Sequence, residues 1–415
     1  MIDKKLFARL AARIDSYEAA MIDMQCRLTA VPALSPESGG DGEYEKSRLI
    51  LSLLQGLDFP QVREINAPDD RVSSGMRPNL IVTLPGKNEA RMVWILTHMD
   101  IVPPGELKFW SRDPYQCYVK EGKLYGRGTE DNQQDLVASI FALKAFLDEG
   151  VTPELGLGLA LVADEETASD FGLKYLLENP ANPFSVSDLI LAPDGGNEEG
   201  SMIEIAEKSL LWLQVKTIGK QTHGSRPAQG SNAFLAASHL IVKLNELHRI
   251  FGDADLLYGP PGSTFQPTKK EANVPNVNTI PGEDVFYLDC RILPRYPLSQ
   301  VLAEIRKIAD NIAKEFSVQI HLTPVHQVEA PPPTPHDASI VLALQEAIRD
   351  VYRVEAHPAG IGGGTVAAFF RKQGYPAAVW CRTGDTAHQP DENCRLEDIL
   401  GNAKVYAHLC LQKGR

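Results

Sequence analysis

A chain of 415 residues, 43% of them hydrophobic, is long enough to bury sizeable cores in two or three domains. Its formal net charge of −13 argues against nucleic acid and anionic membranes as partners, because both bind basic surfaces. No apolar run approaches the roughly 20 residues that a membrane helix requires, so we expect a soluble globular protein.

The cysteines bear on the cellular compartment. The chain opens on a charged amphipathic stretch in place of a signal peptide, and its cysteines form no CxxC pair. We therefore expect a reducing, cytoplasmic location and thiols that serve packing. The six cysteines are Cys26, Cys117, Cys290, Cys381, Cys394 and Cys410.

The first part of the chain has the pattern of an α/β domain. Residues 3–28 have helical spacing and predict a surface helix. After them, apolar runs alternate with helical periods, which is typical of a mostly parallel sheet covered by helices. One predicted helix places an apolar stripe on a single face, formed by Leu136, Ile140, Leu143 and Leu147.

Four of the apolar runs lead into polar residues. The runs are MVWIL, LGLGLALVA, DLILA and AAVWC, and the polar residues that follow them are His98, Asp100, Glu165, Glu166, Asp194 and His388. In open α/β sheets, ligands bind outside the carboxyl ends of the strands. We therefore expect these side chains to converge on one crevice.

Residues 198–328 follow a different pattern. The strand-like SLLWLQVKTIG is followed by a helix, the strand-like NVNTI and DVFYLDCRIL, a second helix and the strand SVQIHLTPV. This βαββαβ order predicts a ferredoxin-like module. The proline-rich APPPTP at 330–335 is typical of a stiff connector, so we expect the first domain to be discontinuous and to comprise residues 1–197 and 329–415.

The residue types at the strand ends suit a metal. Imidazole nitrogen and carboxylate oxygen are ligands of zinc-like ions, and Asp100 can fix the ring tautomer of His98 from the same strand face. Asp131, just before a predicted helix, can be an N-cap or can bridge two metals. Each signal has a second interpretation, because His98 alone is compatible with a structural histidine and the acidic pair Glu165–Glu166 with an exposed loop.

Five segments together resemble one family. THMDIVPPG, LYGRGTEDNQQ, ADEE, LAPDGG and GDTAHQPDENC stand in the order of the co-catalytic zinc amidohydrolases and peptidases. That family includes succinyl-diaminopimelate desuccinylase, acetylornithine deacetylase, aminoacylase, carnosine-type dipeptidases and glutamate carboxypeptidases. The resemblance covers nearly the whole chain. It implies an α/β zinc domain carrying an inserted ferredoxin-like lid and dimerisation domain.

The resemblance also implies two divalent metal ions per chain, zinc or alternatively cobalt or manganese. Asp131 would bridge the two ions. His98 and Asp194 would complete one metal site, and Glu166 and His388 would complete the other. Three carboxylates against two divalent ions leave one positive charge, which a bound hydroxide would neutralise.

Catalytic roles follow from the same resemblance. Glu165 would be the general base, and a metal-bridged hydroxide would attack the scissile amide. Asp100 would orient the ring of His98. His223, in KQTHGSRP, would stabilise the oxyanion from the partner subunit of a homodimer, although the residues alone are equally compatible with a turn histidine.

Positions for substrate binding are implied as well. Arg291 in LDCRILP and Asn278 in NVNTIP match family positions that bind the substrate's carboxylate or oxyanion. An arginine fork suits a carboxylate. The backbone donors of GIGGGTVAAFF belong to the same set, at Gly363, Gly364 and Thr365.

Three functions are compatible with these residues. The first is a hydrolase that removes an acyl group, such as succinyl or acetyl, from an N-acyl amino acid. The second is a metallo-dipeptidase or carboxypeptidase, since both activities cleave an amide beside a carboxylate. The third is an inactive relative that only binds small ligands, and the presence of every ligand position together with Glu165 argues against it.

Overall fold

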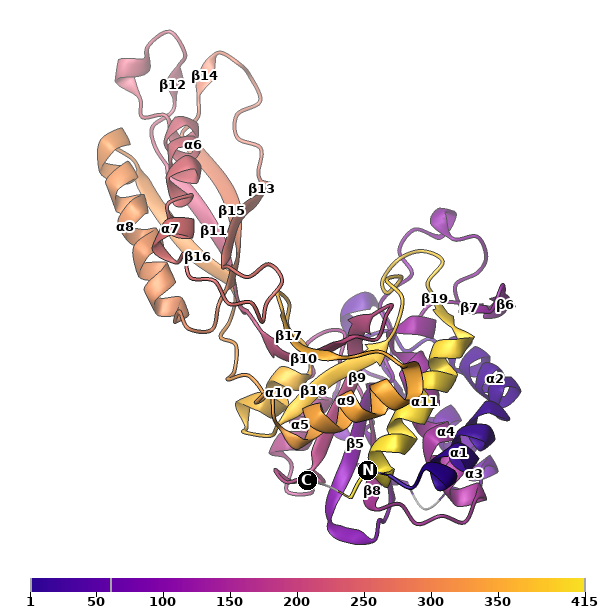
Figure 1. Ribbon diagram of the computed structural model, residues 1–415. Coiled ribbons are helices and arrows are strands. Elements are labelled where there is room, and N and C mark those ends of the chain that lie inside the picture. Colours follow the sequence, from indigo (N-terminus) through magenta and orange to yellow (C-terminus); the bar gives the residue numbers. More distant parts are fainter. Residues whose placement is uncertain (1, 60–61, 414–415) are drawn as a thin grey trace. The chain divides into compact units, whose positions relative to one another are not determined.

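The computed structural model describes residues 2–59 and 62–413, which form two compact units (Figure 1). Unit 1 comprises the described residues up to Ile205, Thr334–Pro358 and the described residues from Phe369 onward. Unit 2 comprises Ala206–Pro333 and Ala359–Ala368. The proline-rich connector therefore lies where the chain returns from unit 2 to unit 1.

The largest sheet has the strand order β1-β4-β8-β5-β9-β18-β10-β17. Its central strands β8, β5, β9 and β18 are parallel neighbours, whereas β4 and β10 pair antiparallel on either side of them. The predicted α/β class with a parallel central sheet is confirmed. The strands are β1 (Arg63–Glu64), β4 (Leu80–Leu84), β5 (Asn88–His98), β8 (Leu155–Val162), β9 (Leu189–Asn197), β10 (Met202–Glu207), β17 (His357–Ile361) and β18 (Ala377–Arg382).

Helices pack against this sheet and bury its apolar side chains. α4 contacts β5 and β8, α9 contacts β9 and β18, and α11 contacts both of these helices. The predicted helix over 3–28 is in fact two helices, α1 and α2, which Ser16 and Tyr17 separate. The helices are α1 (Lys4–Asp15), α2 (Glu18–Thr29), α3 (Tyr44–Gly56), α4 (Gln134–Asp148), α5 (Leu173–Glu178), α9 (Ser339–Tyr352), α10 (Ala367–Lys372) and α11 (Leu396–Leu411).

Short strands at the margins complete this part of the chain. β7 lies between β6 and β19 in a three-stranded sheet, and β2 pairs with β3. These strands are β2 (Ala67–Pro68), β3 (Met76–Arg77), β6 (Tyr118–Lys120), β7 (Lys123–Tyr125) and β19 (Asn393–Arg395).

Two of the cysteines are bonded to each other. Cys26 of α2 forms a disulfide with Cys117, which precedes β6. The expectation that all six cysteines are thiols is therefore wrong for this pair, because the fold brings together two residues that are 91 positions apart. The other four, Cys290, Cys381, Cys394 and Cys410, are buried thiols. Among the described residues, no helix has the length and apolar character to cross a membrane.

Unit 2 contains an antiparallel sheet with the strand order β13-β15-β11-β16. Along the chain the order is β11, α6, β13, β15, α8, β16, which is the predicted βαββαβ succession. α6 and α8 cover one face of the sheet (Figure 1) and bury its apolar side chains. The elements are β11 (Ser209–Ile218), α6 (Ala233–Leu244), α7 (Leu247–Ile250), β13 (Thr264–Lys270), β15 (Glu283–Ile292), α8 (Leu298–Phe316) and β16 (Gln319–Val328).

The predicted position of one strand of this module is wrong. NVNTI contributes only β14 (Thr279–Ile280), which pairs with β12 (Thr222–His223) outside the main sheet. The second strand of the module is instead β13, whose sequence TFQPTKK is polar and contains Pro267. A polar edge strand with a proline lacks the apolar alternation that marks a strand in the sequence.

Candidate metal centre

Four neighbouring strands bring the predicted polar residues to one edge of the sheet. β5 ends at His98, Glu165 and Glu166 follow β8, Asp194 lies in the last part of β9, and the loop after β18 carries His388. Because β8, β5, β9 and β18 are adjacent and parallel, their carboxyl ends meet at the same edge.

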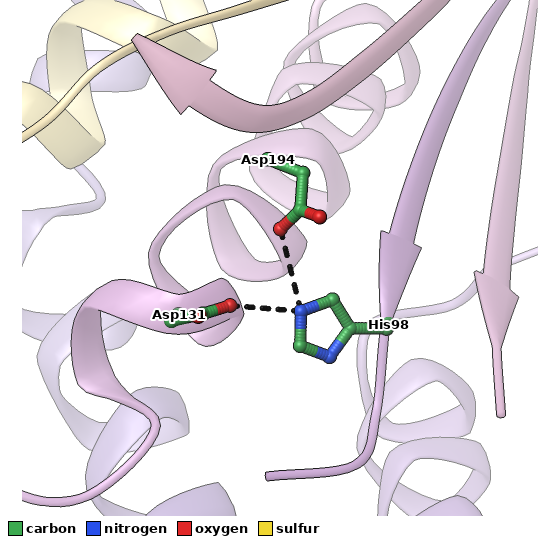
Figure 2. A group of neighbouring side chains, drawn as sticks. All are labelled: His98, Asp131 and Asp194. Carbon is green, nitrogen blue, oxygen red and sulfur yellow. Dashed lines mark hydrogen bonds and ion pairs between the residues drawn. The ribbon is translucent and has the colours of Figure 1, made fainter. Parts of the chain in front are cut away.

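The first group of side chains contains His98, Asp131 and Asp194 (Figure 2). Nε2 of His98 lies 2.9 Å from Oδ1 of Asp131 and 3.4 Å from Oδ1 of Asp194. His98 is 2% exposed, so its ring is held rigidly within the sheet edge. One imidazole nitrogen and two carboxylate oxygens therefore face a common point.

The second group contains Glu166 and His388 and shares Asp131 with the first. Nε2 of His388 lies 3.0 Å from Oδ2 of Asp131 and 3.1 Å from Oε2 of Glu166. The two oxygens of Asp131 thus face different imidazoles. This is the arrangement of a carboxylate that bridges two cations.

The distances fit two zinc-like ions. Nitrogen and oxygen ligands about 2.0–2.1 Å from a tetrahedral zinc lie roughly 3.3 Å apart from each other. The nitrogen-to-oxygen distances in the two groups, 2.9 to 3.4 Å, lie around this value. Each group also offers the imidazole and carboxylate donors that zinc prefers. The residues present therefore fit a pair of divalent ions.

The electrostatic surroundings of the two histidines also favour positive charge at the centre. Burial opposes a charge on His98, but hydrogen bonds to Asp100 and other carboxylates raise its pKa well above the ordinary value. Hydrogen bonds to Asp131 and then to Glu166 raise the pKa of His388 to about 10. Without metal, protons on the two rings supply the positive charge that the carboxylates require.

Asp100 contacts His98 with its backbone and with its side chain. Nδ1 of His98 lies 3.0 Å from the backbone oxygen of Asp100 and 3.5 Å from its carboxylate. The carboxylate also accepts hydrogen bonds from the backbone N–H groups of Glu165 at 3.1 Å and Glu166 at 3.0 Å. Asp100 thus fixes the tautomer of His98 and holds the turn that carries both glutamates.

Glu165 is placed differently from its neighbour. Its carboxylate has no hydrogen-bond partner among the described residues, whereas the carboxylate of Glu166 faces His388. Burial, and next the negative charge of Asp194, raise the pKa of Glu165 well above its usual range. Glu165 is therefore free to accept a proton from a bound reactant.

Three residues near the centre were not anticipated from the sequence. Asn132 donates from Nδ2 to the backbone oxygen of Pro193 at 2.7 Å and to Oδ1 of Asp194 at 3.1 Å, which aligns that carboxylate. Glu130 and Glu392 are buried and bond to backbone atoms of the loops around the centre. No local pattern marks them, because their partners are distant in the sequence.

The predicted substrate-binding residues belong to unit 2 and fall into two sets. His223 and Asn278 are neighbours, since β12 pairs with β14 and Gly224 N–H donates to the Asn278 oxygen at 2.7 Å. Arg291 lies on β15, where its guanidinium makes two hydrogen bonds to Asp289, at 2.7 and 2.9 Å, and a third to Gly362 O at 3.0 Å. The fork predicted to bind a carboxylate is thus occupied by a carboxylate of the protein.

The glycine-rich segment lies near Arg291 within unit 2. Gly362 accepts the hydrogen bond from Arg291, and Gly363, Gly364 and Thr365 follow it directly in the chain. The hydroxyl of Thr365 donates to Glu207 at 2.8 Å. The structure therefore groups Arg291 with this segment, and groups His223 with Asn278.

The sequence between β5 and the end of α11 matches a known family. The model of peptidase family M20/M25/M40 matches residues 94–412. The chain belongs to this family. It is therefore a metal-dependent hydrolase of amide or peptide bonds, and the resemblance found in the five sequence segments is confirmed.

Individual relatives cover most of the chain. It is 38% identical over 407 residues to an uncharacterised metallohydrolase of Methanococcus maripaludis, with 93% of this chain and 97% of the relative covered. It is 28% identical over 315 residues to a succinyl-diaminopimelate desuccinylase of Nautilia profundicola, with 74% and 80% covered. The crystal structure of a tripeptidase from Staphylococcus aureus has the same fold, with a TM-score of 0.73, 18% identity and coverage of 95% and 97%.

Proposed function

We propose that this hydrolase cleaves the amide bond of an N-acyl amino acid and releases an acyl group such as succinyl or acetyl. The observation that carries the proposal is that two metal-binding groups share Asp131, while Glu165, next to the ligand Glu166, has no hydrogen-bond partner for its carboxylate among the described residues. Similarity to a desuccinylase favours an acyl substrate over a peptide.

The metal ligands and Glu165 have separate roles in the proposed reaction. His98, Asp131 and Asp194 would hold one divalent ion, and Asp131, Glu166 and His388 would hold a second. We propose that the ions are zinc, with cobalt or manganese as alternatives, and when bound they would polarise the amide carbonyl and acidify a water. The Glu165 carboxylate takes a proton from the attacking water and returns it to the leaving nitrogen. A carbon–oxygen bond forms, the carbon–nitrogen bond breaks, and the products are a carboxylic acid and an amino acid.

The hydrogen bonds around the centre keep these groups ready for the reaction. The Nδ1–H of His98 donates to the backbone oxygen of Asp100, which leaves Nε2 unprotonated as a ligand. The Asp100 carboxylate holds the backbone of Glu165 and Glu166, so that the base and its neighbouring ligand keep their separation.

A substrate panel tests the proposal. The zinc-loaded protein is assayed with N-succinyl and N-acetyl amino acids and with dipeptides carrying the same carboxy-terminal residue. We expect the N-acyl amino acids to have the higher kcat/KM. Preference for dipeptides would favour the metallo-dipeptidase or carboxypeptidase alternative, and loss of all turnover despite two bound ions would favour the inactive relative.

We also propose that residues 198–328 act as a lid and dimerisation domain on a catalytic domain of residues 1–197 and 329–415. The argument rests on the two sets of residues in unit 2. Leu210 pairs with Arg291 near one end of β11, and Ile218 pairs with Glu283 at the other end, about 26 Å away along the strand. His223 lies beyond this second end, where β12 and β14 stand at one end of the unit (Figure 1).

This separation supports a homodimer. Because His223 and Arg291 of one chain lie near opposite ends of the sheet, a small substrate can contact both only if they come from two chains. α6 also presents an exposed apolar surface, in which Phe234 is 45%, Leu235 47% and Val242 67% exposed. Such a surface suits contact with a second copy.

For the strand that pairs across the dimer, the sequence predicts SLLWLQVKTIG or its neighbour. SLLWLQVKTIG forms β11, which lies between β15 and β16 and so has no free edge, whereas its neighbour β16 is at the edge of the sheet. The edge strands of this sheet are β13 and its opposite, β16. Of the two, β16 is the neighbour of β11. Ile320 is the one buried residue of β16, so most of the length of this strand is available to a partner.

The cytoplasmic location stays a prediction. Disulfides occur mostly in proteins of oxidising compartments, so the bond between Cys26 and Cys117 does not support this prediction.

A further inference from the structure

Two buried glutamates link the turn that presents Asp131 to the loop that presents His388. Glu130 directly precedes Asp131 and is 6% exposed, while Glu392 follows His388 in the same loop and is fully buried. Neither faces the point at which the ligand atoms meet. Each instead bonds to the segment that carries the other.

Glu392 binds the turn that leads into Asp131. Its Oε1 accepts hydrogen bonds from the backbone N–H groups of Glu130 at 3.0 Å and Asp131 at 3.1 Å. Its Oε2 accepts one from the N–H of Gly128 at 3.0 Å and another from the guanidinium of Arg127. One carboxylate thus gathers three N–H groups of a single turn and fixes the backbone of Asp131.

Glu130 binds the loop that leads to His388. Its Oε2 accepts hydrogen bonds from the backbone N–H of Thr386 at 2.7 Å and from the hydroxyl of the same residue. Its Oε1 accepts one from the hydroxyl of Thr383 at 3.0 Å. The backbone two residues before His388 is therefore anchored to the residue next to Asp131.

This inference rests on the two-ion function proposed above. It concerns how the ligands of the ions are held in place. We propose that Glu130 and Glu392 form a reciprocal clasp that positions Asp131 and His388 for the second ion. His388 needs such support because its side chain is 53% exposed and lies in a loop, 3.0 Å from Asp131. Ordering these ligands in advance removes an entropic penalty from metal binding.

The two halves of the clasp affect the two ions differently. The other two ligands of the first group, His98 and Asp194, lie on strands of the central sheet and do not depend on the loop that Glu130 anchors. Loss of Glu130 therefore weakens the site that contains His388, while loss of Glu392, which also fixes Asp131, weakens both sites.

Calorimetric titration of the metal-free protein with zinc tests the clasp. For Glu130→Ala we expect the second binding step to weaken by about 10–100-fold, the usual effect of removing a residue that supports a metal ligand, with the first step unchanged. Glu130→Gln should retain the second step, because its amide can donate to the hydroxyl of Thr383 while its oxygen accepts from Thr386. Glu392→Gln should not, since every neighbour of that carboxylate is a donor.

Two further variants guard against a general loss of structure. Asp188→Asn is the matched control, because Asp188 is also buried and accepts from Met92 N, Trp94 Nε1 and Ser185 N, toward the other end of β5. It should lower the unfolding temperature without changing either binding step. Thr383→Val removes one donor to Glu130 with little change of shape and should weaken the second step alone, so it decides the matter if Glu130→Ala does not fold.

The outcomes separate this inference from the proposed function. Two zinc-binding steps in the wild type, with a second step as tight in Glu130→Ala and Thr383→Val as in the wild type, would overturn the clasp and leave the function standing. A second step weakened equally by Asp188→Asn would also overturn it, as a mere effect of stability. A wild type that binds only one ion would overturn both.

Discussion

Glu165 and Glu166 are adjacent in the chain, yet only Glu166 is engaged by the metal-binding groups. Oε2 of Glu166 lies 3.1 Å from Nε2 of His388, while the Glu165 carboxylate has no partner among the described residues. The Asp100 carboxylate holds both backbone N–H groups, so the turn itself is fixed. The two residues can therefore be assigned separate roles, which substitution can tell apart.

Glu165→Gln should keep the metal content of the wild type and lower kcat by roughly 10²–10⁴-fold, as loss of a general base does. Glu166→Gln should instead lower the metal content, because it removes a ligand oxygen. Elemental analysis and kcat, measured on the same preparations, check both results. Full activity in Glu165→Gln would assign the base to another residue.

A second prediction concerns Asp131, the ligand shared by the two metal-binding groups. Asp131→Ala should lose both ions, because each of its oxygens faces a different imidazole, whereas His98→Ala should empty mainly one site. The number of ions per chain, measured after dialysis against trace zinc, distinguishes the two variants. Equal losses in both would show that the groups do not share Asp131 in the way proposed.

The metal-free protein should lose stability as the pH rises. Since Asp131 and then Glu166 raise the folded-state pKa of His388 from 6.5 to about 10, its contribution is fully present below pH 6.5 and disappears as the pH passes through 10. Thermal unfolding of the metal-free protein at several pH values measures this. His388→Asn should flatten the curve between pH 6.5 and 10, and an unchanged slope would contradict the ion pairs.

Subunit mixing tests the contribution of His223 across a dimer. His223→Ala protein and Glu165→Gln protein are each expected to be nearly inactive. Mixed dimers should regain part of the wild-type rate, because one of their two sites then contains both intact residues. Mixed dimers that form without any return of activity would place His223 in its own chain's site or outside the mechanism.

The disulfide gives a prediction about stability. Cys26→Ser should lower the free energy of unfolding by about 2–4 kcal/mol, because the bond closes a long loop in the unfolded chain. Thiol titration of the unfolded, unreduced wild type should find the four cysteines that are free in the structure. Six titratable thiols would show that the bond does not form.

The strand ends of unit 1 could be predicted from sequence because the signal is local. Each continuous apolar run ends in polar residues, and the parallel sheet then brings His98, Glu166 and Asp194 together. β13 could not be predicted in this way, because a polar edge strand with Pro267 has no apolar alternation. Local pattern thus predicts buried strands far better than exposed ones.

Long-range hydrogen bonds account for much of what the sequence could not supply. The clasp of Glu130 and Glu392 and the hydrogen bond from Asn132 to Asp194 join residues that lie far apart in the chain. Such contacts leave no periodic or spacing signal. They decide how the ligands are held, whereas local pattern indicates which residues the ligands are.

The number of divalent ions bound per chain tests the central claim most directly. After reconstitution with zinc and removal of excess metal, elemental analysis of the wild type should give a ratio close to two, and Asp131→Ala should give a ratio close to zero. A wild-type ratio that stays at zero or one after reconstitution would contradict a centre built from two groups that share Asp131.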